Sequence, residues 1–105
     1  MKQLPQSPTK PEASEDLDAL AAALCALKSP GDVRGFLEDL CTPSELESMS
    51  DRWKVVPLLL QGVTYRDIHD RTGVSVTTVG RVARTIDLGS GAYRKAAGKL
   101  HRHQP

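Results

Sequence analysis

One stretch decides the fold of this chain: TYRDIHDRTGVSVTTVGRVART, residues 64–85. Its pattern predicts two short helices joined by a sharp turn at Gly73, since glycine readily adopts the positive φ that ends a helix. Thr64, followed three residues later by Asp67, resembles a capping box at the start of the first helix. Ser75 can cap the second helix in the same way. The stretch is therefore typical of a helix-turn-helix.

The two sides of this motif differ in chemistry. The inner side, which can face the angle between the helices, is formed by Ile68, Thr72, Val74, Val79 and Val82. The other side of the second helix, called the outer face below, consists of Ser75, Val76, Thr77, Gly80, Arg81 and Arg84. Small, hydroxylated and cationic side chains of this kind can enter the major groove of DNA and meet bases and phosphates. We therefore predict a DNA-binding protein that regulates transcription.

Two alternatives fit the same stretch. Residues 74–79 are rich in β-branched side chains and alternate imperfectly with period two, which is a pattern of a strand. We favour the helix, because the sequence nearby offers neither a partner strand nor a turn signal. An ordinary helical hairpin with no role in DNA binding would also show a helix–glycine–helix pattern.

The rest of the chain predicts further helices, most of them opened by a polar capping residue or a proline. They are expected over Glu15–Lys28 after Ser14, from Pro30 to about Leu40 after Ser29, from Pro43 toward Gln61 after Thr42, and over Tyr93–Leu100 after Ser90 and Gly91. Pro57 falls inside the third of these helices, where its ring and missing N–H predict a kink or a break. The predicted fold is all-α.

Length and composition predict one domain. Residues 1–13 are proline-rich and predict a disordered arm, residues 14–101 a single helical domain, and residues 102–105 a flexible tail. The domain is short for a self-sufficient core, so a core shared with a second subunit would stabilise it. No apolar run approaches the roughly 20 residues of a membrane span, and the start of the chain lacks a signal-peptide pattern, so we expect a cytoplasmic protein.

The net charge of +1 hides an asymmetry. Residues 1–41 hold four Lys or Arg and seven Asp or Glu, whereas residues 42–105 hold ten and six. The basic excess therefore lies on the part of the chain that carries the helix-turn-helix, where cations can neutralise phosphates. The cations available there are Arg66, Arg71, Arg81, Arg84, Arg94, Lys95, Lys99 and Arg102.

The sequence offers no pattern of an enzyme or a metal site. No paired carboxylates, nucleophile–base set or phosphate loop stands out, so we predict no catalytic residues and no cofactor. Cys25 and Cys41 are far apart in the sequence, and we expect both to be reduced and to act as small apolar packing residues. His69, His101 and His103 do not combine with them at the spacing of metal ligands.

Two long segments resemble the Trp repressor family, in particular its branch of Trp-repressor-like bacterial regulators. The segments are FLEDLCTPSELESMSDRW and LLLQGVTYRDIHDRTGVSVTTVGRV, and the resemblance covers roughly residues 33–93. It implies an all-α, intertwined homodimer in which the N-terminal helices of one subunit wrap the other. It also implies two helix-turn-helix heads, which would read double-stranded DNA at palindromic half-sites about 34 Å apart.

The resemblance also assigns DNA contacts. It places Tyr65, Arg66 and His69 where the first helix of the motif meets the backbone and flanking bases. It places Ser75, Val76, Thr77 and Gly80 where the recognition helix meets the major groove. Arg81 and Arg84 can bind phosphates beside them. The function predicted is a sequence-specific regulator, in particular a repressor; the alternative is a helical dimerisation or adaptor module without specific DNA binding.

An effector pocket is the remaining expectation from the resemblance, at Thr42, Arg52, Arg81 and Thr85. In the Trp repressor two arginines hold and stack the tryptophan ligand, and Arg52 and Arg81 occupy those positions here. Arg81 can equally bind a phosphate or form a surface ion pair, and Arg52 can pair within its own helix. Val82 replaces a glycine that makes room for the ligand, and Trp53 adds bulk, which argues against L-tryptophan and leaves the effector unknown.

Overall fold

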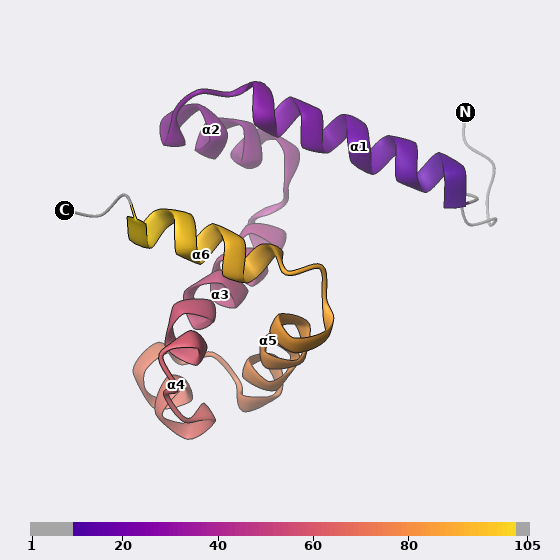
Figure 1. Cartoon of the computed structure of the whole chain (residues 1–105). Helices are drawn as coiled ribbons and strands as arrows, with labels where there is room; N and C mark the ends of the chain where they lie inside the picture. Colours follow the sequence, from indigo (N-terminus) through magenta and orange to yellow (C-terminus); the bar gives the residue numbers. More distant parts are fainter. Residues whose placement is uncertain (1–9, 103–105) are drawn as a thin grey trace, which may run out of the picture. The chain divides into compact units, whose positions relative to one another are not determined.

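The computed structural model describes residues 10–102 and shows only helices and connecting turns within that range. The helices of Figure 1 are α1 (Lys10–Ala26), α2 (Pro30–Leu40), α3 (Pro43–Leu60), α4 (Tyr65–Thr72), α5 (Val76–Leu88) and α6 (Ala92–Arg102). The all-α prediction is confirmed. The chain divides into two compact units, residues 1–42 with α1 and α2, and residues 43–105 with the other helices.

In the first unit, α2 begins as its sequence predicts. The Ser29 side chain accepts a hydrogen bond from the backbone N–H of Asp32 at 3.1 Å, and Pro30 occupies the first helical position. The helix ends where the N–H of Cys41 donates to the carbonyl of Leu37 at 2.9 Å. The Ser29 cap and the proline at the first position therefore account for the start of α2.

The start predicted for α1 is wrong. The helix begins at Lys10 rather than Glu15, so Ser14 lies inside it and does not cap it, and residues 10–13 are helical rather than part of the arm. Lys, Glu and Ala favour helix, and a proline as its second residue is tolerated because the first turn has no N–H bond to lose. The helix also ends at Ala26, two residues early. Residues 1–9 lie outside the described range.

In the second unit, α3 packs against α4, α5 and α6. The buried apolar core consists of Val55, Val56, Ile68, Val74, Val79, Val82 and Ile86. The four apolar residues predicted for the inner side of the motif are all among them, and Thr72 is half-buried. Neighbouring Val55 and Val56 are both fully buried, because α3 is covered from more than one side.

The helix α3 continues through Pro57, so of the predicted kink or break the break is wrong and the kink stays a prediction. Proline costs one backbone hydrogen bond, but apolar residues on both sides of it pack into the core and hold the helix together. The helix ends at Leu60, one residue before the predicted Gln61, and Gly62, the predicted stop, lies in the turn that follows. Gly62 has a φ of +85°, and its N–H donates to the carbonyl of Leu59 at 3.0 Å.

The last helix, α6, follows Gly91, whose φ is +89°. It packs on α3, and the rings of Tyr93 and Trp53 lie with their centroids 6.4 Å apart and tilted by 41°. Such tilted aromatic pairs add to the stabilisation from apolar burial. Within residues 10–102, no helix combines the length and the apolar character that a membrane span requires.

Candidate nucleic-acid interface

The helix-turn-helix predicted for residues 64–85 is formed by α4 and α5, and each predicted cap is present. Thr64 Oγ1 accepts from the N–H of Asp67 at 3.2 Å, and Ser75 Oγ accepts from the N–H of Thr78 at 3.1 Å. Gly73 has a φ of +78° and ends α4. The strand considered for residues 74–79 does not form, because the Ser75 cap starts a helix there.

Side chains brace the turn between the two helices. Thr72 Oγ1 donates to the carbonyl of Ile68 at 2.7 Å and accepts from the N–H of Val74 at 3.1 Å. His69 Nδ1 lies 2.8 Å from the carbonyl oxygen of the same Val74. Both backbone polar groups of Val74, itself 4 % exposed, are thus held by side chains of α4. The bracing fixes the start of α5 relative to α4.

The structure exposes the outer face as the sequence predicts. Ser75, Val76, Thr77, Arg81 and Arg84 are exposed, and Gly80 is half-buried. The caps and the buried inner side together turn these groups outward, because α5 can bury only one stripe against α3 and α4.

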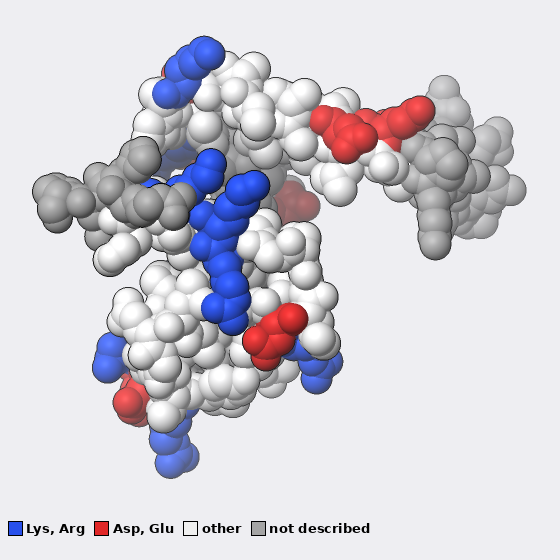
Figure 2. Space-filling view, viewed as in Figure 1, with Lys and Arg blue, Asp and Glu red and all other residues white. Residues whose placement is uncertain are grey.

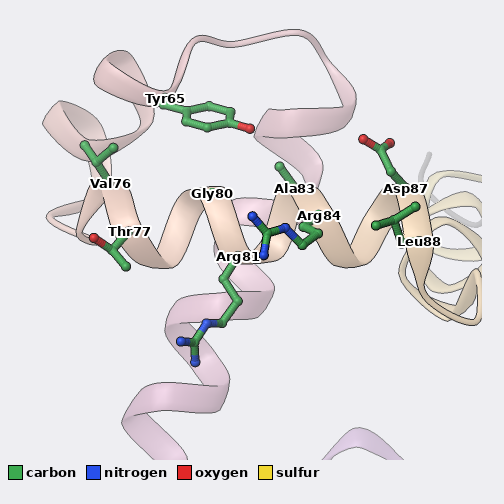
Figure 3. A pocket seen from close by; sticks show the side chains of 9 residues that line it. All are labelled: Tyr65, Val76, Thr77, Gly80, Arg81, Ala83, Arg84, Asp87 and Leu88. Carbon is green, nitrogen blue, oxygen red and sulfur yellow. The ribbon is translucent and has the colours of Figure 1, made fainter.

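An open groove with a volume of about 620 Å³ runs along this face. Six of the nine residues predicted to meet DNA line it: Tyr65, Val76, Thr77, Gly80, Arg81 and Arg84. The other three, Arg66, His69 and Ser75, are exposed outside the groove. Figure 3 shows the Tyr65 ring over the turn of α5 that holds Gly80, whereas the Arg81 side chain points away from that ring.

Three residues of the groove were not predicted: Ala83, Asp87 and Leu88. The helix α5 continues to Leu88, one turn beyond the predicted motif. Residues three, four and seven positions after Gly80 lie on the same helix face as Gly80, and these are residues 83, 84 and 87. Extending the periodicity of the outer face would therefore have identified Ala83 and Asp87. Asp87 is exposed, and its Oδ1 lies 3.9 Å from an Nη atom of Arg94.

The structure shows the charge asymmetry predicted from the sequence, with an acidic excess in the first unit and a basic excess in the second. Figure 2 shows Lys and Arg side chains along α6, and Asp and Glu side chains on α1. Of the basic residues of α6, Arg94, Lys95 and Lys99 are exposed. They add cations to the unit that carries the groove, where a polyanion would be attracted.

A further site could involve the potential metal ligands or the cysteines of the described residues. Among residues 10–102, no group of three or more His, Cys, Asp or Glu could hold a metal ion. Cys25 and Cys41 are free thiols; Cys41 is half-buried, but Cys25 is exposed, which contradicts its predicted packing role. Leu17 of the same helix is also exposed, at 65 %. His103 lies outside the described range.

Comparison with known proteins identifies the family of this chain. The sequence profile of the Trp repressor protein family matches residues 15–101. The chain belongs to the Trp repressor family. It is 35 % identical over 86 residues to the uncharacterised protein YerC of Bacillus subtilis (strain 168), covering 82 % of this chain and 83 % of YerC.

Solved structures agree with this membership of the Trp repressor family. A TrpR-like protein from Eubacterium eligens matches with a TM-score of 0.78 and 32 % identity, over 87 % of this chain and 94 % of that one. A candidate Trp repressor from Staphylococcus aureus matches with a TM-score of 0.80 and 30 % identity, over 94 % of this chain and 100 % of that one. The family is one of helix-turn-helix regulators, which accords with the motif.

The effector pocket expected for a Trp repressor relative remains a prediction. Arg52 is half-buried on α3, and Arg81 and Thr85 are exposed on α5, where Thr85 Oγ1 donates to the carbonyl of Arg81 at 3.1 Å. Thr42 is the last residue of the other unit. Val82 is 1 % exposed and belongs to the core, so its isopropyl group fills space that a glycine would leave open.

Proposed function

We propose that this protein is a sequence-specific DNA-binding regulator of transcription that acts as a repressor on a palindromic operator. The observation that carries the proposal is the outer face of α5, which is exposed, partly cationic and braced on its inner side by a buried core. A rigid helix that presents short polar and cationic side chains is suited to the major groove.

The individual contacts follow from side-chain chemistry. Val76 and Thr77 stand at the start of α5, where their methyl groups can touch the methyl group of thymine. Arg66 can donate to guanine or to a phosphate, and Arg81 and Arg84 can donate to phosphates along the groove. Base contacts would supply the specificity, and phosphate contacts most of the affinity that depends on salt.

A homodimer is part of the proposal. Among the residues whose burial the structure describes, the buried apolar core belongs to the second unit, whereas the first unit leaves Leu17 65 % and Leu40 53 % exposed. Apolar side chains exposed on a short chain favour burial against a second copy. Two copies related by a twofold axis would present two recognition helices, and this symmetry is the reason to expect a palindromic operator.

The test is selection of bound fragments from a random DNA pool, followed by titration of the selected and of random duplexes at several salt concentrations. We expect one palindromic motif, and binding of both duplexes that weakens as salt rises. Absence of binding even at low salt would overturn the proposal and favour a dimerisation or adaptor module. Binding without sequence preference would overturn the claim of an operator.

A further inference from the structure

A hydrogen bond at the turn determines which atom of one predicted contact residue can meet DNA. The Nδ1 atom of His69 lies 2.8 Å from the carbonyl oxygen of Val74. A carbonyl oxygen only accepts hydrogen bonds, so Nδ1 must be the donor and must carry a proton. The interaction thereby selects one of the two neutral tautomers of the ring.

The other ring nitrogen is left for an external partner. His69 is an exposed residue, and among residues 10–102 its Nε2 atom has no hydrogen-bond partner. In the neutral ring with a proton on Nδ1, Nε2 carries a lone pair and can only accept. Phosphate oxygens also only accept, so the neutral ring cannot bind the DNA backbone directly through this atom.

The major groove offers two kinds of donor to such an acceptor. These are the N4 amino group of cytosine and the N6 amino group of adenine, since guanine and thymine present acceptors and a methyl group there. Arg66, one helical turn earlier on α4, has only donors and suits guanine or phosphate instead. Arg66 and His69, both exposed on α4, therefore differ in what they can recognise.

We infer that His69 is a specificity-determining residue: its Nδ1–H braces the turn at Val74, and its Nε2 accepts a hydrogen bond from an adenine or cytosine amino group. The inference rests on the proposed function, because it names the bases that one residue of the same interface would select. It divides the ring into an inward atom that positions the recognition helix and an outward atom that reads a base.

The tautomer is tested first, on the free protein. Nitrogen-15 NMR of the imidazole rings at pH 8 should show His69 protonated on Nδ1 and unprotonated on Nε2. The His69→Asn variant identifies the signal by its loss, since two other histidines lie near the end of the chain. A ring protonated on Nε2 would overturn the inference whatever the protein does with DNA.

The base contact is tested at the same pH with the full-length protein and its selected duplex. In His69→Asn, the side-chain amide can still donate near the position of Nδ1, but the atom equivalent to Nε2 is gone. We expect an affinity about tenfold lower for the selected duplex, less than twofold lower for random DNA, and a lost preference for adenine or cytosine at one symmetric pair of positions. The matched control is Gln61→Asn, a neutral exposed residue outside the motif, which should change neither affinity.

The outcomes separate this inference from the proposed function. A wild-type protein that selects no motif contradicts the proposed function and the inference with it. A wild-type motif that His69→Asn leaves unaltered contradicts the inference alone. Equal losses on selected and random DNA, with an unfolding temperature equal to that of wild type, would instead assign His69 to the phosphate backbone and overturn the inference.

Discussion

Tyr65 lies against Gly80, with its Cε2 atom 3.7 Å from the position that a Cβ atom on Gly80 would occupy. The first residue of α4 is thereby in contact range of the outer face of α5, halfway along the groove. At this distance a methyl group at position 80 makes ordinary van der Waals contact with the ring, and a longer side chain directed toward Tyr65 would displace it. Both residues line the groove.

Substitution of Gly80 should separate stability from binding. Gly80→Ala places its methyl group at ordinary contact distance and removes a helix-destabilising glycine, so the free energy of unfolding should rise by about 0.5–1 kcal/mol. Gly80→Leu should displace Tyr65 and fill the groove, and lower DNA affinity at least tenfold in anisotropy titrations. Unchanged affinity for Gly80→Leu would show that the groove is not the DNA-binding surface.

The turn between α4 and α5 requires a left-handed backbone conformation at Gly73. Gly73 has a φ of +78°, which costs an L-residue roughly 1–2 kcal/mol. Gly73→Ala should therefore lower the free energy of unfolding by about that amount in urea denaturation. Gly73→Asn is the matched control and should lose less, because asparagine tolerates this conformation. Equal losses would mean that strain in φ does not decide the effect.

The cap of the recognition helix contributes to stability apart from any DNA contact. Ser75 Oγ accepts from the N–H of Thr78, and Ser75→Ala should cost about 1 kcal/mol of unfolding free energy. Ser75→Asn keeps a capping oxygen and should restore most of the loss. If both variants were equally destabilised, the Ser75 hydroxyl would act through its 3.1 Å hydrogen bond to Thr78 Oγ1 instead.

The sequence predicted most of what is decided locally, the start of α1 excepted, and missed what packing decides. The caps at Ser29, Thr64 and Ser75 and the left-handed turn at Gly73 depend on neighbouring residues, so short-range patterns identified them. The continuity of α3 at Pro57 depends instead on apolar contacts with three other helices, which no local pattern contains.

The same distinction holds for the site. The periodicity of residues 75–84 identified the outer face, because one buried stripe fixes the direction of every side chain of α5. The groove was not foreseeable in full, since it needs Tyr65 to approach from α4 and α5 to extend to Leu88. The bond between His69 and Val74 likewise depends on the path of the turn.

Two substitutions should distinguish base reading from phosphate binding. Thr77→Ala removes an exposed side chain at the start of α5 and should weaken binding to the selected duplex several-fold, with little effect on random DNA. Arg84→Gln should weaken both duplexes alike and lower the salt dependence of binding by about one unit of slope. Equal loss on both duplexes for Thr77→Ala would contradict its base-reading role.

L-Tryptophan should not bind this protein in the manner of the repressor that names the family. The buried Val82 side chain fills the space that a glycine would leave, so an indole would have to displace it from the core. Isothermal titration of the wild-type protein with L-tryptophan should therefore show no saturable heat. Val82→Ala, expected to cost about 2 kcal/mol of stability, tests whether side-chain volume is the obstacle. Saturable binding of L-tryptophan to the wild type at micromolar concentrations would contradict the expectation and show that the ligand can displace the Val82 side chain.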